Sequence, residues 1–388
     1  MLSISSIREA RADASSIVRV ITESVIFTIA VVLLVCAVGA NQQWLDRHFL
    51  PSFLWPRHWY TLIERSVRVG MAALGAWLAI GARTRAGRLA ARAPATTLHV
   101  VLAAILAFGA AEVALTRMKL QPAEWLFPDE EPLRRPDSRL AWTFVPSRAG
   151  HRTIGGRDIE YAFDSHGYRV GRLDEPVDLE RPTTLFTGES VMVGEGLTWE
   201  ESVPAQVGMM MGVQSANLAV HGFSTDQAYL RLERELPRFR RPVAVVSLFM
   251  TGLFGRNLYD DRPHLGPGLV PEPAKLHTRL ISLAQIFVPY RSDEAIERGI
   301  RATRDVLRAS AALAVAHGAT PLIIVPQFGN DDPRDQMLRG RILDESGVSY
   351  VLVELDQAWR IPWDRHPDAR AAHAVAAAIA ARLQTARE

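Results

Sequence analysis

Long apolar runs in the first third of the chain restrict its fold more than any other feature of the sequence. Residues 24–40 (SVIFTIAVVLLVCAVGA) carry no charge, and residues 96–115 form a second such run that includes His99 and Glu112. A helical membrane span takes about 20 apolar residues and satisfies its own backbone polar groups, which lipid cannot do. The sequence therefore predicts a region of transmembrane helices over residues 1–120.

A shorter apolar run lies between these two. Residues 69–82 (VGMAALGAWLAIGA) reach the length of a span only by including Glu64, Arg65 or Arg68, whose long side chains can reach a membrane interface. We expect about three spans. Residues 83–92 (RTRAGRLAAR) have four arginines and no acid, which places this connection in the cytoplasm. The rest of the chain would then lie on the periplasmic side of a multi-pass inner-membrane protein.

From about residue 122 the pattern changes to that of a globular domain. We expect a linker and lead-in segment over residues 121–160 and a folded domain over residues 161–388. Within that domain, five apolar runs have the length of strands: 183–187, 213–220, 242–250, 320–327 and 349–355. Helical patterns lie between or after them, at 225–236, 293–317, 332–346 and 369–384. This alternation predicts an α/β fold, with a parallel five-stranded sheet between layers of helices.

Composition argues against several kinds of function. The net charge is only +2, and no basic run alternates with aromatic residues, so we expect no nucleic-acid partner. The one cysteine, Cys36, lies inside the first apolar run, which excludes an internal disulfide. The sequence shows no His, Asp and Glu cluster with the spacing of metal ligands, so we expect neither a metal nor a cofactor.

Three segments contain candidate catalytic residues. Ser190 follows the run 183–187 through Gly188, and ligands of doubly wound sheets bind beyond the carboxyl ends of strands. Gly222 forms a turn after the second run. Asp364 and His366 precede the last helix, and a carboxylate that orients an imidazole is what a serine hydroxyl needs to lose its proton. Each segment alone also fits an ordinary helix cap, turn or surface loop.

Taken together, the three segments resemble the SGNH or GDSL hydrolase superfamily. Their order is Gly-x-Ser, then Asn-Leu-x-Val-x-Gly-x-Ser-Thr-Asp-Gln, then Asp-x-His, and residues 163–169 (FDSHGYR) are similar to a lead-in of membrane-linked members. The resemblance implies a three-layer α/β/α flavodoxin-like domain with strand order 2-1-3-4-5 that cleaves or transfers acyl esters without a metal. It makes Ser190 the nucleophile, His366 the base, Asp364 its carboxylate, and the Gly222 N–H an oxyanion donor.

The sequence departs from the family pattern in three places. Glu189 replaces the aspartate beside the nucleophile, and the closing motif is one residue shorter than the usual Asp-x-x-His, which leaves the role of Asp364 open. The third departure is the missing Asn after the third strand, whose side chain normally completes the oxyanion hole. Asn257 comes several residues late, and Thr251 or Arg256 are the other candidates for this role. The polar loop 256–264 would otherwise contact substrate or simply face solvent.

These expectations combine into one functional hypothesis and one alternative. The first is a membrane-anchored esterase or O-acyltransferase that acts through an acyl-serine intermediate on an acylated envelope glycan or lipid. The alternative is a catalytically impaired module of the same fold that binds or scaffolds partners in an envelope assembly, because fold alone does not determine function.

Overall fold

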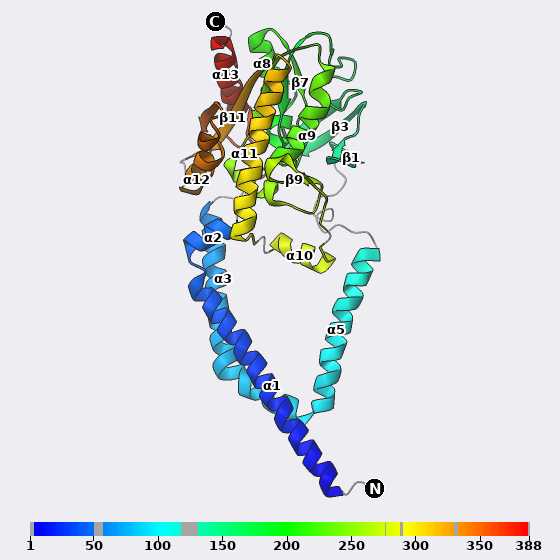
Figure 1. Cartoon of the computed structure of the whole chain (residues 1–388), viewed down its shortest axis with the longest axis vertical. Coiled ribbons are helices and arrows are strands. Elements are labelled where there is room, and N and C mark those ends of the chain that lie inside the picture. The colour runs from blue at the N-terminus through cyan, green and yellow to red at the C-terminus, as the bar shows by residue number, and fades with distance from the viewer. Residues whose placement is uncertain are drawn as a thin grey trace. The chain divides into compact units, whose positions relative to one another are not determined.

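The computed structural model describes residues 4–49, 57–117, 131–275, 277–287, 290–329 and 333–386 (Figure 1). Residues 121–130 of the predicted linker and residue 332 of a predicted helix lie outside these ranges. The chain divides into two compact units. The first consists of Met1–Phe49, Pro56–Leu126 and Thr278–Pro289, and the second of Leu50–Trp55, Phe127–His277 and Tyr290–Glu388.

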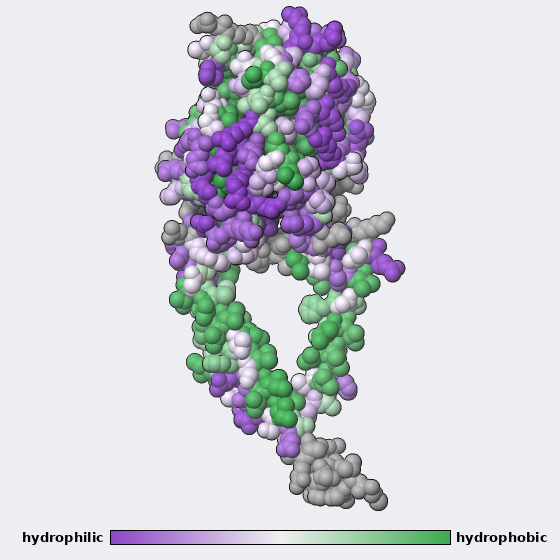
Figure 2. Space-filling view, viewed as in Figure 1, coloured by the Kyte–Doolittle hydropathy of each residue, from purple (hydrophilic) through white to green (hydrophobic). Residues whose placement is uncertain are grey.

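The first unit is helical. Its elements are α1 (Ile4–Gly39), α2 (Gln42–His48), α3 (Arg57–Trp77), the π-helical η1 (Leu78–Ala82), α4 (Arg83–Arg92), α5 (Pro94–Arg117) and α10 (Arg279–Phe287). Two helical segments are long and apolar enough to cross a membrane, Asp13–Gly39 and Pro94–Arg117, and Figure 2 shows apolar side chains along both helices. The middle run, residues 69–82, is divided between α3 and η1 and does not meet this standard.

Close packing within the first unit depends on glycine. α1 packs against α3 and α4. A Cβ atom on Gly75 would lie 3.0 Å from the carbonyl oxygen of Ala30, and one on Gly87 would overlap the side chain of Glu23. The absence of a side chain at both positions therefore lets the helices approach closely.

Glu112, a charged residue within an apolar helix, has a structural partner in the same unit. Its two carboxylate oxygens accept the backbone N–H groups of Arg279 and Leu280, at 2.7 and 2.9 Å. The first N–H groups of a helix have no acceptor inside that helix. Glu112 of α5 therefore caps the N-terminus of α10, a contact between residues far apart in the sequence.

The second unit contains an eight-stranded sheet of order β12-β11-β8-β6-β7-β5-β4-β3. Five strands are parallel: β6 (Pro182–Thr187), β7 (Gln214–Asn217), β8 (Arg241–Leu248), β11 (Thr320–Phe328) and β12 (Tyr350–Leu355). In chain order they are arranged 2-1-3-4-5. Each of the five predicted runs overlaps one of these strands, so a mostly parallel sheet of this order is confirmed.

The prediction of a sheet with only five strands is wrong. Three antiparallel strands, β3 (Arg148–Ile154), β4 (Arg157–Phe163) and β5 (Arg169–Val170), extend it beyond β7. Gly155 and Gly156 turn β3 into β4 with φ of 58° and 78°, a left-handed conformation that suits a two-residue hairpin turn. The predicted lead-in segment therefore belongs to the sheet. Without these strands, the parallel sheet would end at β7 with unpaired backbone N–H and C=O groups, and the antiparallel strands bond to that edge.

Helices cover both faces of the sheet. Successive residues of a strand point to opposite faces. On β8, Val245 packs with Leu232 of α9 (Thr225–Glu235) and Ala314 of α11 (Asp293–Ala316), whereas its neighbour Val246 shares a cluster with Val375 of α13 (Ala369–Thr385). α8 (Val203–Met211) packs on α13, and α12 (Pro333–Ile342) packs on α11. The predicted helices are therefore present, each within a few residues of its predicted bounds.

The remaining elements of the second unit are short. They are β1 (Arg134–Asp137), β2 (Ala141–Phe144), α7 (Ser190–Val193), η2 (Leu236–Arg238), η3 (Thr251–Leu258), β9 (His264–Leu265), η4 (Pro267–Leu269), β10 (Pro271–Glu272) and η5 (Asp344–Ser346). Two of them, α7 and η3, follow the carboxyl ends of the central strands β6 and β8, where the candidate site lies.

Candidate active site

Ser190 is the first residue of α7 and lies at the end of the central strand β6. Gly188, between them, has φ of 155°, and a Cβ atom there would lie 2.8 Å from the Cβ of Leu248 on β8. A residue with a side chain would not fit at this position, and glycine therefore allows the tight turn. Glu189 caps α7 by accepting the N–H of Val191. Ser190 itself is fully buried.

The structure brings Ser190, His366 and Asp364 into one hydrogen-bonded line. His366 Nε2 lies 2.9 Å from Ser190 Oγ, and His366 Nδ1 lies 2.5 Å from Asp364 Oδ1. His366 is buried like Ser190, whereas Asp364 is half-buried. This is the order of a nucleophile, its base and an orienting carboxylate.

A tight turn lets Asp364 reach the imidazole although the motif is one residue short. Ile361 N–H donates to the carbonyl of His366 at 2.8 Å, and Arg365 N–H donates to the carbonyl of Ile361 at 2.9 Å. Arg365 has φ of 74°, a left-handed conformation that folds the segment back on itself. Asp368 then begins α13 by accepting the N–H groups of Arg370 and Ala371.

The surroundings of His366 favour its protonated form. Burial by itself would lower the pKa of the imidazole, because it removes the charged form from water. The hydrogen bond that His366 donates to Asp364 outweighs this effect, together with the negative charges of Glu195, Asp364 and Glu189. The pKa of His366 is therefore raised above its ordinary 6.5. The site is therefore an acidic cluster around one imidazole.

Two backbone N–H groups near the serine are available as donors. Beyond β7 the chain continues beside β6, because Leu218 N–H donates to the carbonyl of Phe186 at 2.8 Å and Val220 N–H to that of Gly188 at 3.2 Å. This alignment carries the following turn, at Gly222, toward Ser190. No residue that the structure describes accepts the N–H of Ser190 or of Gly222.

Comparisons with known proteins found matches among solved structures. No protein-family model and no curated protein matches the sequence. Among solved structures, the acetyl xylan esterase Est2A from Butyrivibrio proteoclasticus shares 12% identity, with a TM-score of 0.34, over 55% of this chain and 66% of that one. This chain thus spans just under two thirds of that esterase.

Two further solved structures are similar over about half of this chain. The carbohydrate acetylesterase Est24 from Sinorhizobium meliloti shares 13% identity, with a TM-score of 0.33, over 53% of this chain and 99% of its own. A GDSL-like lipase from Bacteroides thetaiotaomicron shares 13% identity, with a TM-score of 0.30, over 53% and 88%. These values are too low to assign an activity to this chain.

The strand order and the places of Ser190, Gly222 and His366 along the chain are those that the sequence resemblance implies. The sheet of the second unit therefore agrees with the fold that the resemblance implies. The candidate site differs from the pattern of the resembled family most clearly where the third strand ends.

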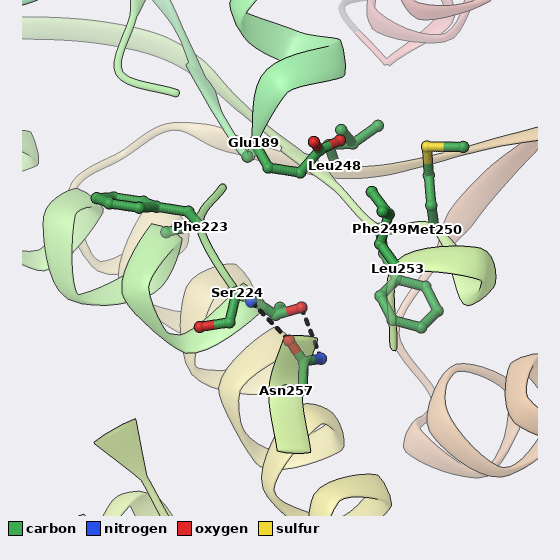
Figure 3. Close-up of a pocket in the computed structure, with 11 residues that line it drawn as sticks. Glu189, Phe223, Ser224, Leu248, Phe249, Met250, Leu253 and Asn257 are labelled. Atoms are coloured by element: carbon green, nitrogen blue, oxygen red, sulfur yellow. Dashed lines mark hydrogen bonds between the residues drawn. The ribbon is translucent and has the colours of Figure 1, made fainter. Parts of the chain in front are cut away.

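Asn257, a candidate oxyanion donor, has other partners. Its Nδ2 donates to Thr225 Oγ1 at 2.9 Å, and its Oδ1 accepts the N–H of Thr225 (Figure 3). The second hydrogen of Nδ2 is donated to Thr303 Oγ1 at 2.8 Å. In this arrangement the amide has no N–H left for an oxyanion at Ser190. Asn257 instead joins η3 to α9 and α11. Thr251 is half-buried at the start of η3.

Arg256 and Glu189 form an ion pair beside Ser190. Arg256 Nη1 lies 3.1 Å from Glu189 Oε2, and the hydroxyl of Ser190 donates to the same oxygen at 2.5 Å. A carboxylate only accepts hydrogen bonds. The hydroxyl hydrogen therefore points to Glu189, and His366 must present an N–H to Ser190 Oγ. Before the serine can attack, this hydrogen has to turn toward a neutral His366.

A mostly apolar pocket adjoins this ion pair. Gly188 and Glu189 form part of its wall, and Figure 3 shows apolar side chains in its lining: Phe223, Leu248, Phe249, Met250 and Leu253. The other lining residues are Ser224, Thr225, Ala228 and Asn257. It lies at the carboxyl ends of β6 and β8, as expected for a ligand site in a sheet of this type.

His221 lies in the turn directly before Gly222. It is half-buried, and its Nδ1 pairs with the buried carboxylate of Glu195. Glu195 also accepts from Arg152 Nη1 at 2.6 Å. Burial alone would raise the pKa of Glu195, but the charge and hydrogen bond of His221, with the charges of His366 and Arg152, hold that pKa far below its ordinary value. Sequence gave no signal for Glu195, whose partners lie 26 and 43 residues away.

Arg169, the last of the lead-in residues 163–169, anchors the helix α7 that begins with Ser190. Arg169 is completely buried, and its guanidinium donates to the carbonyls of Val193, Gly194 and Leu197 at 2.7, 2.8 and 2.7 Å. The last carbonyls of a helix lack partners within it. Arg169 thus holds the turn after α7, and with it Ser190. Within the described residues, no group of three or more His, Cys, Asp or Glu is arranged to hold a metal.

Proposed function

We propose that this chain is a membrane-anchored esterase or O-acyltransferase in which Ser190 carries the acyl group. The observation that supports this most directly is the line from Ser190 Oγ to His366 Nε2 at 2.9 Å and from His366 Nδ1 to Asp364 at 2.5 Å. A hydroxyl becomes a nucleophile near neutral pH when an adjacent base can take its proton.

The reaction has two halves. In the first, His366 takes the proton of Ser190, Oγ attacks the ester carbonyl carbon, and the bond to the alcohol oxygen breaks as His366 returns the proton to the departing alcohol. In the second, water or a sugar hydroxyl attacks the acyl-serine and His366 takes its proton. That proton then returns to Ser190 as the acyl group leaves with water or with the sugar.

The negative oxygen formed in each half would be stabilised by the N–H groups of Ser190 and Gly222. A missing side-chain donor costs about a hundred- to a thousandfold in turnover where it has been measured. If substrate separates Arg256 from Glu189, the guanidinium becomes a third donor, whereas Thr251 and Asn257 are weaker candidates for that role. The apolar pocket beside Glu189 suits the acyl group.

The proposed substrate is an acylated glycan or lipid of the cell envelope, because the SGNH fold is joined to a helical unit with two apolar helices of membrane-spanning length. A third crossing by residues 69–82 would place the second unit in the periplasm, with the arginines of α4 inside. No metal or other cofactor takes part in the proposed reaction.

A fluorophosphonate probe, which reacts with activated serines, tests the proposal on the full-length protein in detergent. We expect the wild type to be labelled and to hydrolyse a short-chain aryl ester, and Ser190→Ala to do neither. Ser215→Ala is the matched control, since Ser215 is also buried but bonds only the carbonyl of Pro204. Equal labelling of wild type and Ser190→Ala would remove Ser190 from the mechanism.

The alternative is a binding or scaffolding module in an envelope assembly. It is favoured by the full burial of Ser190, by its hydroxyl pointing to Glu189, and by the other bonds of Asn257. In that case the wild type would resist the probe and ester hydrolysis would be absent, while the fold stays intact.

A further inference from the structure

The peptide bond between His221 and Gly222 has its orientation fixed from one side. The indole Nε1–H of Trp142 donates to the carbonyl oxygen of His221 at 3.0 Å. In a planar trans peptide the C=O and N–H groups point in opposite directions. The bond from Trp142 therefore directs the N–H of Gly222 away from the indole, and no described residue accepts it.

The side chain of His221 is held from another direction. Its Nδ1 pairs with Glu195, whose side chain is only 2% exposed. Glu195 lies just beyond α7, and its backbone N–H donates to the carbonyl of Ser190 at 3.0 Å. The pair thus links the segment that contains Ser190 to the turn that contains Gly222. The backbone N–H groups of these two residues are the available donors.

We propose that Trp142, His221 and Glu195 form a clamp that positions the Gly222 N–H for the oxyanion. This inference rests on the function proposed above and adds positioning residues to the same site. Trp142 belongs to β2, outside the parallel sheet, so the segment before the sheet would contribute to catalysis as well as to stability. None of the three residues needs to touch substrate.

The clamp matters because few donors are present. Asn257 uses both amide hydrogens elsewhere, which leaves two backbone N–H groups as the fixed donors. A backbone donor cannot adjust as a long side chain can, and a misplacement of about 1 Å in a catalytic site can cost about a hundredfold in rate. The orientation of one peptide plane is therefore decisive.

Replacing Trp142 with Phe tests the clamp in the full-length protein. This change keeps an aromatic ring and removes the N–H. We expect kcat for an aryl ester to fall by about tenfold or more. KM should be unchanged, and so should the pH below which activity is lost as His366 becomes protonated, the acid limb of the pH profile. The affinity for an aryl boronate, whose tetrahedral adduct on Ser190 places an oxygen in the hole, should fall in parallel. Trp199→Phe is the control, because the Trp199 indole is half-buried in the same unit and donates to no described residue.

A second variant separates the hydrogen bond from packing. Substituting Trp142 by β-(3-benzothienyl)alanine keeps the bicyclic ring and places sulfur where the N–H was. We expect the same loss of kcat and boronate affinity, with an unchanged thermal unfolding temperature. If this variant is fully active, the clamp is wrong, even where Trp142→Phe loses activity. A wild type that neither hydrolyses the ester nor binds boronate would instead overturn the proposed function, and the clamp with it.

Discussion

His366 is the residue whose protonation state controls the proposed reaction. Only its neutral form can take the proton of Ser190, and three carboxylates keep its pKa above the ordinary 6.5. Activity should therefore rise with pH through a value above 6.5 and be lost below it. A pH series of kcat/KM on one aryl ester measures this limb, and a limb below 6.5 would contradict the structure.

Variants of the two partner residues separate their roles. His366→Ala removes the base and should lower kcat by about a hundred- to ten-thousandfold. Asp364→Asn removes a charge that raises the pKa of His366 and makes the hydrogen bond to His366 Nδ1 a weaker, neutral one. Its acid limb should therefore move to lower pH, while its maximal kcat falls less than that of His366→Ala. Near-normal turnover in His366→Ala, or greater damage in Asp364→Asn, would show that their roles are reversed.

Glu189 competes with His366 for the hydroxyl hydrogen of Ser190. Glu189→Asp keeps the charge and can still cap α7, but its carboxylate is one methylene further from the hydroxyl. We expect several-fold faster labelling by a fluorophosphonate, measured well above the acid limb. Glu189→Gln is the companion variant, and it should move the acid limb to lower pH because the Glu189 charge raises the pKa of His366. Slower labelling of Glu189→Asp would mean that Glu189 assists the attack.

Among the elements, the turn after α7 depends most on a single side chain. Arg169→Met would leave the carbonyl of Leu197 with no donor among the described residues, at a cost of about 1–3 kcal/mol for an unsatisfied group. The carbonyls of Val193 and Gly194 would keep one donor each, Asn217 Nδ2 at 3.4 Å and the N–H of Leu197 at 3.1 Å. We expect the free energy of unfolding to fall by about 1–3 kcal/mol, as measured by urea denaturation.

The matched control for Arg169 is Arg172→Met. Arg172 is exposed, and among the described residues its guanidinium pairs with Asp174 alone, which is also exposed. Solvent screens such a pair, so it contributes little to stability. Its loss should leave the free energy of unfolding close to that of the wild type. Similar effects of the two substitutions would show that the carbonyl contacts of Arg169 do not stabilise the fold.

At the scale of the whole molecule, the number of membrane crossings decides on which side of the membrane the second unit lies. If α1, α5 and the run at 69–82 all cross, the C-terminus is periplasmic, because the arginines of α4 stay inside. Alkaline phosphatase, which is active only in the periplasm, should be active when fused after Glu388. The same reporter fused after Arg92 should be inactive. Activity with the opposite pattern would mean that the middle run does not cross or that the orientation is inverted.

The sequence by itself determined the order of elements and the core of the site. Apolar runs and helical periods are local patterns, so the five parallel strands and the helices after them were predicted within a few residues. Ser190, Gly222 and His366 follow strand ends or precede a helix, and parallel strands bring such positions to one edge of the sheet. Their proximity was predictable once the sheet was expected.

Only the tertiary structure decided which side chains meet. Trp142 bonds the carbonyl of His221 across 79 residues, and Arg256 meets Glu189 across 67. The hairpin strands β3 and β4 likewise join the sheet through a segment that the sequence assigned to a linker. A single hydrogen bond or ion pair between distant residues leaves no periodic pattern in the chain, because it depends on where the packed elements place each side chain. The sequence therefore indicated the candidate catalytic groups, and the fold determined the contacts that orient them and influence their protonation.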